Sequence, residues 1–268
     1  MPSENEAKRI FDKSRVIVNG HVVYAKKEDG WFHGGQYFNK DAIYPHTRYV
    51  SLLCKHIARH AGRLLRDDIG VVVGPTVGGV SLSQWTAYWL SSHREVLSVY
   101  ADEEDVVEQY KIKGEELRQL GQNISFIASG AVEITLAPYP NVIEEITYML
   151  KVGTHRVMRR GYDNVVKGKN CFVVEDVIHT GKTVLDTINA TRRAGGFVRG
   201  VGSLCNSSGG KVTADSLGVP ELFSLLERDT EIFREEECLI CKEEGPESVR
   251  TDIGKGREFL LRRGLLKV

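Results

Sequence analysis

Apolar positions along the chain follow two different spacings, and the change between them predicts alternating helices and strands. Within residues 47–65, apolar side chains recur every three or four positions, at Val50, Leu53, Ile57 and Ala61. This spacing is typical of one buried helix face. Short continuous apolar runs elsewhere, such as 69–73, are too short for helices and indicate buried strands.

Two segments share one order of elements: an apolar strand, a glycine-bearing turn and a helix. In the first, the strand at 69–73 leads into a turn from Gly74 to Gly79. In the second, the strand at 171–174 is followed by a turn, a helix at about 182–194 and a further strand. This alternation indicates an α/β fold with a parallel sheet, in which ligands bind at the carboxyl ends of the strands.

The remaining segments are less regular. Residues 15–24 alternate and predict a hairpin that turns at Asn19-Gly20, whereas residues 30–41 are glycine-rich and aromatic and predict a surface loop. We interpret residues 103–155 as an inserted subdomain. Its expected elements are a polar, helical or mobile segment at 103–122, two strands at 123–129 and 131–137, and a short helix at 140–150.

Composition narrows the class of protein. The 268 residues carry a formal net charge of +0, so no global field recruits nucleic acid or a membrane surface. The chain has no apolar run of the roughly 20 residues that span a bilayer, and its first ten residues lack the apolar core of a signal peptide. Five cysteines, an odd number, fit reduced thiols. We expect a cytoplasmic protein without nucleic-acid or membrane partners.

The stretch CFVVEDVIHTGKTV, residues 171–184, carries the strongest chemical signal. Glu175 and Asp176 end the strand, and the turn HTGKT then opens a helix, which is the arrangement of a phosphate cradle. The two acids can hold Mg²⁺, bind a pair of ribose hydroxyls, or act as general acid and base. A P-loop is excluded, because Asp176 stands where its first glycine is required. A phosphate site beside a diol site points to a ribose 5-phosphate.

VVEDVIHTGKT, residues 173–183, resembles the phosphoribosyl-diphosphate (PRPP) motif of the type I phosphoribosyltransferases. VVVGPTVGGVSLS, residues 71–83, is similar to their pyrophosphate loop, and FHGGQYFNKDAIYPH, residues 32–46, resembles the N-terminal stretch of orotate phosphoribosyltransferase-like members. With 159–177 and the stretch after residue 200, the resemblance covers about two thirds of the chain. It implies the family's Rossmann-like parallel-sheet fold and a Mg²⁺-dependent transfer from PRPP to a nucleobase.

The resemblance also implies roles for individual residues. Glu175 and Asp176 would contact the ribose hydroxyls and are the implied catalytic pair, with Mg²⁺ bridging ribose and pyrophosphate. The 5-phosphate loop would comprise His179, Thr180, Gly181, Lys182 and Thr183. The pyrophosphate loop would comprise Gly74, Pro75, Thr76, Val77, Gly78 and Gly79. A homodimer is implied as well, because a mobile lid of one subunit commonly reaches the other subunit's site.

The base site departs from the orotate pattern. Orotate members usually carry an arginine where LCNSSGG places Ser207, and His179 stands where they often have threonine. Candidate base or lid residues are Lys40, Arg159, Arg160 and Ser207. The base therefore stays open between orotate and another nucleobase. A catalytically silent PRPP- or nucleotide-binding regulator is the alternative function.

The expected organisation has four parts. Residues 1–102 form the N-terminal segment and the first half of the core, 103–155 the insertion, 156–233 the PRPP-binding half, and 234–268 a charged tail. The tail holds a CxxC pair, Cys238 and Cys241, at metal-ligand spacing. Because zinc needs four ligands and no second pair follows, buried structural thiols are the main interpretation and zinc the alternative. No metal ligand is assigned.

Overall fold

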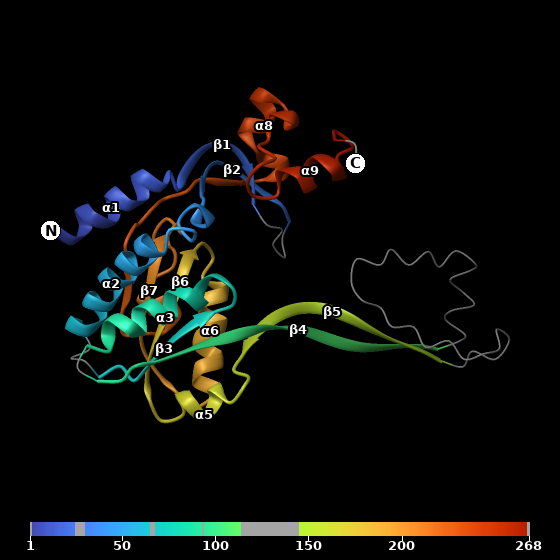
Figure 1. Cartoon of the computed structure of the whole chain (residues 1–268). Helices are drawn as coiled ribbons and strands as arrows, with labels where there is room; N and C mark the ends of the chain where they lie inside the picture. The colour runs from blue at the N-terminus through green and yellow to red at the C-terminus, as the bar shows by residue number, and fades with distance from the viewer. Residues whose placement is uncertain (1, 25–29, 65–67, 93, 114–144, 267–268) are drawn as a thin grey trace. The chain divides into compact units, whose positions relative to one another are not determined.

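The structure is a computed structural model that describes residues 2–24, 30–64, 68–92, 94–113 and 145–266. Contacts between Cα atoms divide the chain into two units (Figure 1). The first unit comprises Met1–Asp102 and Met158–Val268, and the second comprises Glu103–Val157.

The helices are α1 (Pro2–Ser14), η1 (Lys40–Ala42), α2 (Thr47–Leu64), α3 (Gly78–Leu90), α5 (Tyr162–Val166), α6 (Lys182–Arg193), α7 (Ala214–Leu217), η2 (Glu235–Glu237), α8 (Leu239–Glu244), η3 (Pro246–Ser248) and α9 (Gly256–Arg262). The strands are β1 (Ile17–Val23), β2 (Phe32–Phe38), β3 (Val71–Pro75), β4 (Leu97–Lys113), β5 (Glu145–Val157), β6 (Asn170–Ile178), β7 (Phe197–Asn206), β8 (Leu222–Ser224) and β9 (Ile232–Arg234).

The first unit is built on a parallel sheet with the order β4-β3-β6-β7-β8. Strands β3 and β6, which precede the two glycine-bearing turns, are direct neighbours: Val71 pairs with Cys171 and Val73 with Val173. Their carboxyl ends therefore lie at the same edge. The α/β class and the parallel sheet predicted from the sequence are confirmed.

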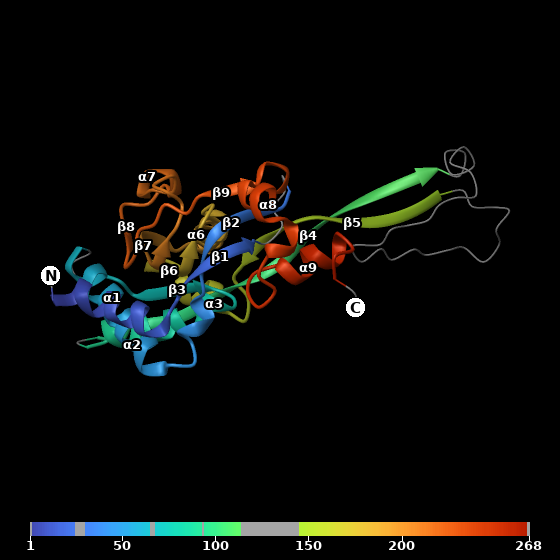
Figure 2. The same cartoon turned by 90° about the horizontal axis from the view of Figure 1, so that it is seen from above.

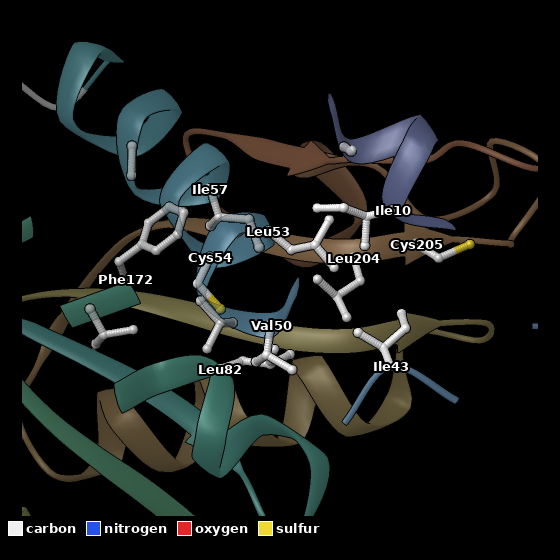
Figure 3. Packing of buried hydrophobic residues seen from close by; sticks show 14 of the residues in the cluster. Ile10, Ile43, Val50, Leu53, Cys54, Ile57, Leu82, Phe172, Leu204 and Cys205 are labelled. Carbon is white, nitrogen blue, oxygen red and sulfur yellow. The ribbon is translucent and has the colours of Figure 1, made fainter. Parts of the chain in front are cut away.

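Helices cover both faces of this sheet, and its strand residues alternate between two cores. Phe172 and Val174 pack with α1, α2 and α3, where Leu53 of α2 is fully buried (Figure 3). Val173 points to the opposite face and packs with α6, which contributes Ile188. A strand buried on both faces explains the continuous apolar runs in the sequence.

A second, antiparallel sheet in the first unit has the order β1-β2-β9. It corrects two sequence predictions. Residues 15–24 do not form a hairpin, because Gly20 lies at a register shift within the single strand β1. Residues 30–41 are not a surface loop, because β2 pairs with β1 on one side and with β9 on the other. The glycines misled the prediction, since Gly34 serves close packing against Tyr24.

The tail packs beside this small sheet. In Figures 1 and 2, α8 and α9 lie next to β1 and β2. The main chain agrees, since the Arg250 amide donates to the His21 carbonyl at 2.8 Å and the Lys255 amide to the Val23 carbonyl at 2.7 Å. Strand β1, near the start of the sequence, and the tail therefore pack together as one part of the first unit.

The second unit contains the outer part of β4 together with β5. Ion pairs connect these strands, with Lys151 Nζ 2.5 Å from Asp105 and Arg156 3.0 Å from Glu103. Residues 103–113 and 145–150 are therefore strand, and the helices predicted within 103–122 and 140–150 are wrong over these parts. The strands predicted at 123–129 and 131–137 lie outside the described residues. Among the described helices, none is long and apolar enough to cross a membrane.

Candidate functional site

The paired acids lie at the carboxyl end of β6, and both are buried: Glu175 and Asp176 are each 4% exposed. Successive strand residues point to opposite faces of the sheet, so the two carboxylates lie in different surroundings. Asp176 faces η1, α2 and the start of α3, whereas Glu175 lines a cavity in front of α6. The strand thus presents one carboxylate to each side of the sheet edge.

Asp176 joins three segments of the first unit. Its Oδ2 lies 2.6 Å from Lys40 Nζ and accepts a hydrogen bond of 3.2 Å from the Tyr44 hydroxyl. Burial would lower the pKa of Lys40, but the charge of Asp176, the hydrogen bond to it and the nearby acids Glu175 and Asp41 together outweigh burial, and the pKa is raised. Tyr44 also lies 2.8 Å from the carbonyl of Gly78, so the carboxylate and the first glycine-bearing turn are held together.

Glu175 is in a different electrostatic state. Burial, followed by repulsion from Asp176, raises the pKa of Glu175 well above its ordinary value. Its Oε1 accepts a hydrogen bond from the Asp176 amide at 3.1 Å, whereas Oε2 has no hydrogen-bond partner among the described residues. A buried oxygen without a partner is costly in a fold and is typical of a site that a ligand completes.

The turn from Gly74 to Gly79 has no room for side chains at its glycines. A Cβ on Gly74 would lie 2.1 Å from the carbonyl oxygen of Gly79, and a Cβ on Gly78 would lie 1.8 Å from Asp176 Oδ2. The Thr76 amide donates to the Ala101 carbonyl at 3.0 Å, and the Val77 side chain at the tip is 86% exposed. The turn is therefore a tight backbone cradle beside Asp176, followed by the N-terminus of α3.

The second turn leads into α6. Gly181 has a φ of 78°, a left-handed conformation that favours glycine, and α6 begins at the next residue. Amides in the first turn of a helix lack intrahelical acceptors and attract anions. Lys182 turns its ammonium toward Asp186, 2.7 Å away, so the backbone and the threonine hydroxyls make up the cradle.

A cavity of about 320 Å³ adjoins this second turn. One wall is formed by Glu175 and the turn, and the other by residues of the small antiparallel sheet and its flanks, Tyr24, Tyr37 and Ile232. Burial and then Tyr37 raise the pKa of Tyr24 to about 12, and the charge of nearby Arg228 opposes this shift. Tyr24, Tyr37 and Ile232 were not predicted from the sequence, because no pattern in it places them beside residue 179.

His179 connects the two walls of the cavity. Its ring lies edge-on to Tyr24, with centroids 5.7 Å apart, and its Nδ1 is 2.7 Å from Ser207 Oγ. The Ser207 hydroxyl donates to the carbonyl of Ile178, so it accepts from His179 Nδ1 and directs Nε2 away from the serine. The histidine and serine that depart from the orotate pattern are therefore partners of each other.

The predicted lid residues are placed differently. Arg160 lies 3.1 Å from Asp102 and its guanidinium lies over the Tyr100 ring, so it packs on the first residues of β4. Neither Arg159 nor Arg160 is among the described residues that line the cavity. The structure thus brings Lys40 and Ser207 to the site and leaves the two arginines outside the cavity.

The acidic pair offers oxygen donors of the kind that Mg²⁺ takes. Asp176 Oδ2 lies beside Gly78 of the first turn, whereas Glu175, with its unpartnered Oε2, lines the cavity at the second turn. Two carboxylates without histidine or cysteine suit a hard cation that arrives bound to phosphate oxygens. The residues present therefore fit Mg²⁺ carried by a phosphorylated ligand.

Comparison with known proteins finds no matching family model, but it does find similar curated proteins. The chain is 27% identical over 234 residues to orotate phosphoribosyltransferase of Caldanaerobacter subterraneus subsp. tengcongensis, covering 87% of this chain and 90% of that protein. It is 27% identical over 241 residues to the orotate phosphoribosyltransferase of Pelotomaculum thermopropionicum, covering 90% and 93%. The predicted resemblance to orotate phosphoribosyltransferases is confirmed and spans most of the chain.

Solved structures of phosphoribosyltransferases are also similar to this chain. Orotate phosphoribosyltransferase from Aeropyrum pernix has a TM-score of 0.48 at 16% identity, covering 82% of this chain and 92% of that one. The Mycobacterium tuberculosis enzyme in complex with 5-phospho-alpha-D-ribosyl 1-diphosphate has a TM-score of 0.45 at 15% identity, covering 85% and 90%.

Proposed function

We propose that this protein is a Mg²⁺-dependent phosphoribosyltransferase that moves the 5-phosphoribosyl group of PRPP to a nucleobase of the orotate type and releases pyrophosphate. One observation carries the proposal: two backbone cradles meet at the strand edge where Asp176 lies. Asp176 Oδ2 is in contact with Tyr44, which also holds the Gly78 carbonyl, and β6 then continues into the α6 cradle. The curated relatives named orotate phosphoribosyltransferase support the same activity.

Each part of PRPP matches one part of the site. The amides at the start of α6, with the hydroxyls of Thr180 and Thr183, bind the 5-phosphate. Glu175 and Asp176 bind the ribose hydroxyls, and the Gly74–Gly79 turn binds pyrophosphate. Lys40, 2.6 Å from Asp176, adds positive charge between ribose and pyrophosphate. Mg²⁺, when bound with PRPP, neutralises charge on the leaving pyrophosphate.

The base belongs in the cavity that Tyr24 and His179 line. There a ring nitrogen attacks the anomeric carbon while the bond to pyrophosphate breaks and its electron pair leaves with pyrophosphate. The proton of that nitrogen is taken up by pyrophosphate or water. The protein's contribution is positioning and charge stabilisation, since no covalent intermediate is required.

Arg228 is a candidate for recognising a carboxylated base. It is half-buried, its guanidinium donates to Gln36 Oε1, and its charge acts on Tyr24. It therefore supplies a cation close to the cavity wall in place of the arginine missing at Ser207. This argument favours orotate over uncharged bases.

The direct test is pyrophosphate release from PRPP and Mg²⁺ with orotate, uracil, adenine, guanine and hypoxanthine supplied separately, with the nucleotide product identified by mass. Turnover with at least one base is expected, and orotate is expected to be the best. A double variant, Glu175→Gln with Asp176→Asn, should lose turnover and PRPP binding. Asp163→Asn, an exposed acid of α5, is the control and should change neither.

Two failures of this test have different meanings. If calorimetry shows PRPP binding but no base gives turnover, the protein is a PRPP-binding regulator and not an enzyme. If the double variant binds PRPP as tightly as the wild type, Glu175 and Asp176 are not part of the PRPP site.

Two further properties are part of the proposal. The resemblance supports a homodimer, which light scattering of the purified chain tests directly. None of the five cysteines forms a disulfide in the structure, which supports residence in the reducing cytoplasm.

A further inference from the structure

Four side chains with metal-binding atoms, none of them part of the acidic pair, meet where the tail packs on the small antiparallel sheet. They are His21 of β1, His33 of β2, and the CxxC pair Cys238 and Cys241 of the tail. One donor atom of each lies within 4.8 Å of every other. Three of the four residues are buried, with His33 and Cys238 at 0% exposure. Segments more than 200 residues apart in the sequence thus converge on one point.

The distances fit a tetrahedral ion. His21 Nε2 lies 3.5 Å from Cys238 Sγ and 3.6 Å from Cys241 Sγ, and His33 Nδ1 lies 3.4 Å from Cys241 Sγ. The two imidazole nitrogens are 2.9 Å apart. A nitrogen at about 2.0 Å and a sulfur at about 2.3 Å from a tetrahedral zinc ion lie about 3.5 Å from each other. The three nitrogen–sulfur distances therefore match those of a zinc ligand set, and the two nitrogens need to separate by a few tenths of an ångström.

Neighbouring groups orient two of these ligands. His21 Nδ1 is 2.7 Å from Ser248 Oγ, and that hydroxyl donates its hydrogen to the Gly245 carbonyl at 2.7 Å. Ser248 must then accept from Nδ1, which leaves the lone pair of His21 Nε2 directed at the thiols. The Cys241 amide donates to Cys238 Sγ at 3.4 Å, a contact that orients the sulfur.

We propose that His21, His33, Cys238 and Cys241 bind one structural Zn²⁺ ion. Two thiolates and two imidazoles are a ligand set that zinc prefers, and four protein ligands leave no position for a reacting water. The site is separate from the Mg²⁺ chemistry of Asp176 and holds whether or not the proposed activity does.

The small apolar core between the tail and the antiparallel sheet indicates what the zinc ion would stabilise. The apolar cluster that joins the tail to the sheet has four buried members among the residues that the structure describes, Val23, Val249, Phe259 and Leu260. A core of this size stabilises little, and small structures of this kind usually need a disulfide or a metal. Zinc would fasten the tail to β1 and β2. Because Tyr24 follows β1 and Tyr37 lies on β2, the same ion would fix one wall of the cavity.

Metal content of the purified full chain is the first test. Elemental analysis after dialysis against metal-free buffer should give one zinc per chain. Cys238→Ser and Cys241→Ser should lose it, whereas Cys171→Ser, a buried thiol of β6 outside the cluster, should retain it. Absence of zinc in the wild-type chain, or zinc retained in both tail variants, would overturn the proposal.

A second measurement does not depend on the folding of variants. Wild-type protein unfolded, stripped of metal and refolded with Co²⁺ should show the intense visible bands of a tetrahedral ion and a near-ultraviolet thiolate charge-transfer band. One equivalent of Zn²⁺ should abolish both. Weak bands typical of octahedral oxygen ligation would contradict a site of this composition.

Thermal unfolding and thiol labelling complete the test. A strong zinc chelator should lower the Tm of the wild-type chain by roughly 5 °C or more and should leave the Tm of Cys238→Ser unchanged.

Under non-reducing conditions, Cys238 and Cys241 should react with an alkylating reagent only after chelation. If they remain unreactive after chelation and release two thiols on reduction, a disulfide occupies the place assigned to zinc.

Discussion

Lys40 Nζ lies 2.6 Å from Asp176 Oδ2, and this ion pair connects the start of the chain with the acidic strand end 136 residues later. The carboxylate that the proposed function assigns to ribose is paired with a cation. Asp176 is 6% exposed in its side chain and Lys40 is 34% exposed, so the lysine reaches in from the solvent side. The proposed function assigns Lys40 a contact with the pyrophosphate of PRPP, which would take the ammonium from Asp176.

Lys40→Met removes this charge and keeps most of the side-chain volume. A charge-assisted hydrogen bond contributes about 1.5 to 3 kcal/mol, so the KM for PRPP should rise roughly tenfold to a hundredfold. The KM for the base should change little. Steady-state kinetics with both substrates varied measures the two effects, and Lys13→Met, an exposed lysine of α1, is the matched control. An unchanged KM for PRPP would remove Lys40 from the binding site.

Gly78→Ala tests the contact between the first cradle and Asp176. The added Cβ would lie 1.8 Å from Asp176 Oδ2, so either the carboxylate or the turn must move. PRPP binding should fall at least tenfold, a loss of about 1.4 kcal/mol. Gly153→Ala is the control, because a Cβ there meets no described atom within 4 Å. Calorimetric titration with PRPP compares the two variants, and equal affinities would contradict a cradle at Gly78.

Glu175→Gln separates stability from function. The folded-state pKa of Glu175 is raised above its ordinary 4.5, so its contribution to stability is complete below that pH and is lost as pH rises through the folded pKa. As pH rises from about 4.5, the free energy of unfolding of the ligand-free wild type should fall relative to that of Glu175→Gln. Urea unfolding at several pH values measures this difference.

The control for this pH series is Glu95→Gln, which replaces an exposed acid. Its pH profile should run parallel to that of the wild type. Should Glu175→Gln also run parallel, the buried acid would not be the group that titrates.

Arg228→Gln tests the choice of base. If the guanidinium recognises a carboxylate, the KM for orotate should rise about tenfold or more, while that for an uncharged base should not. Gln36→Ala removes the hydrogen bond between Gln36 and Arg228 but keeps the cation, so it should affect orotate much less. Equal effects of the two variants on orotate would indicate that Arg228 only holds β2 in place.

The core of the site could be predicted from the sequence because its signals are local. A strand end, two acids, a glycine with positive φ and a helix start are contiguous at Glu175 to Lys182. Backbone geometry alone turns such a run into a cradle at the edge of a parallel sheet. Residues 30–41 were mispredicted for the opposite reason, since their glycines are explained by a strand whose partners are distant in sequence.

The sequence by itself determined the α/β class, the two cradles and the acidic pair, because helix and strand periodicity and turn chemistry act over a few residues. Only the tertiary structure decided which side chains complete them. It brought Lys40 to Asp176, Tyr24 to His179, and His21 and His33 to the CxxC pair, across separations of 136, 155 and more than 200 residues. Such pairings depend on how whole sheets pack, and no local pattern records that packing.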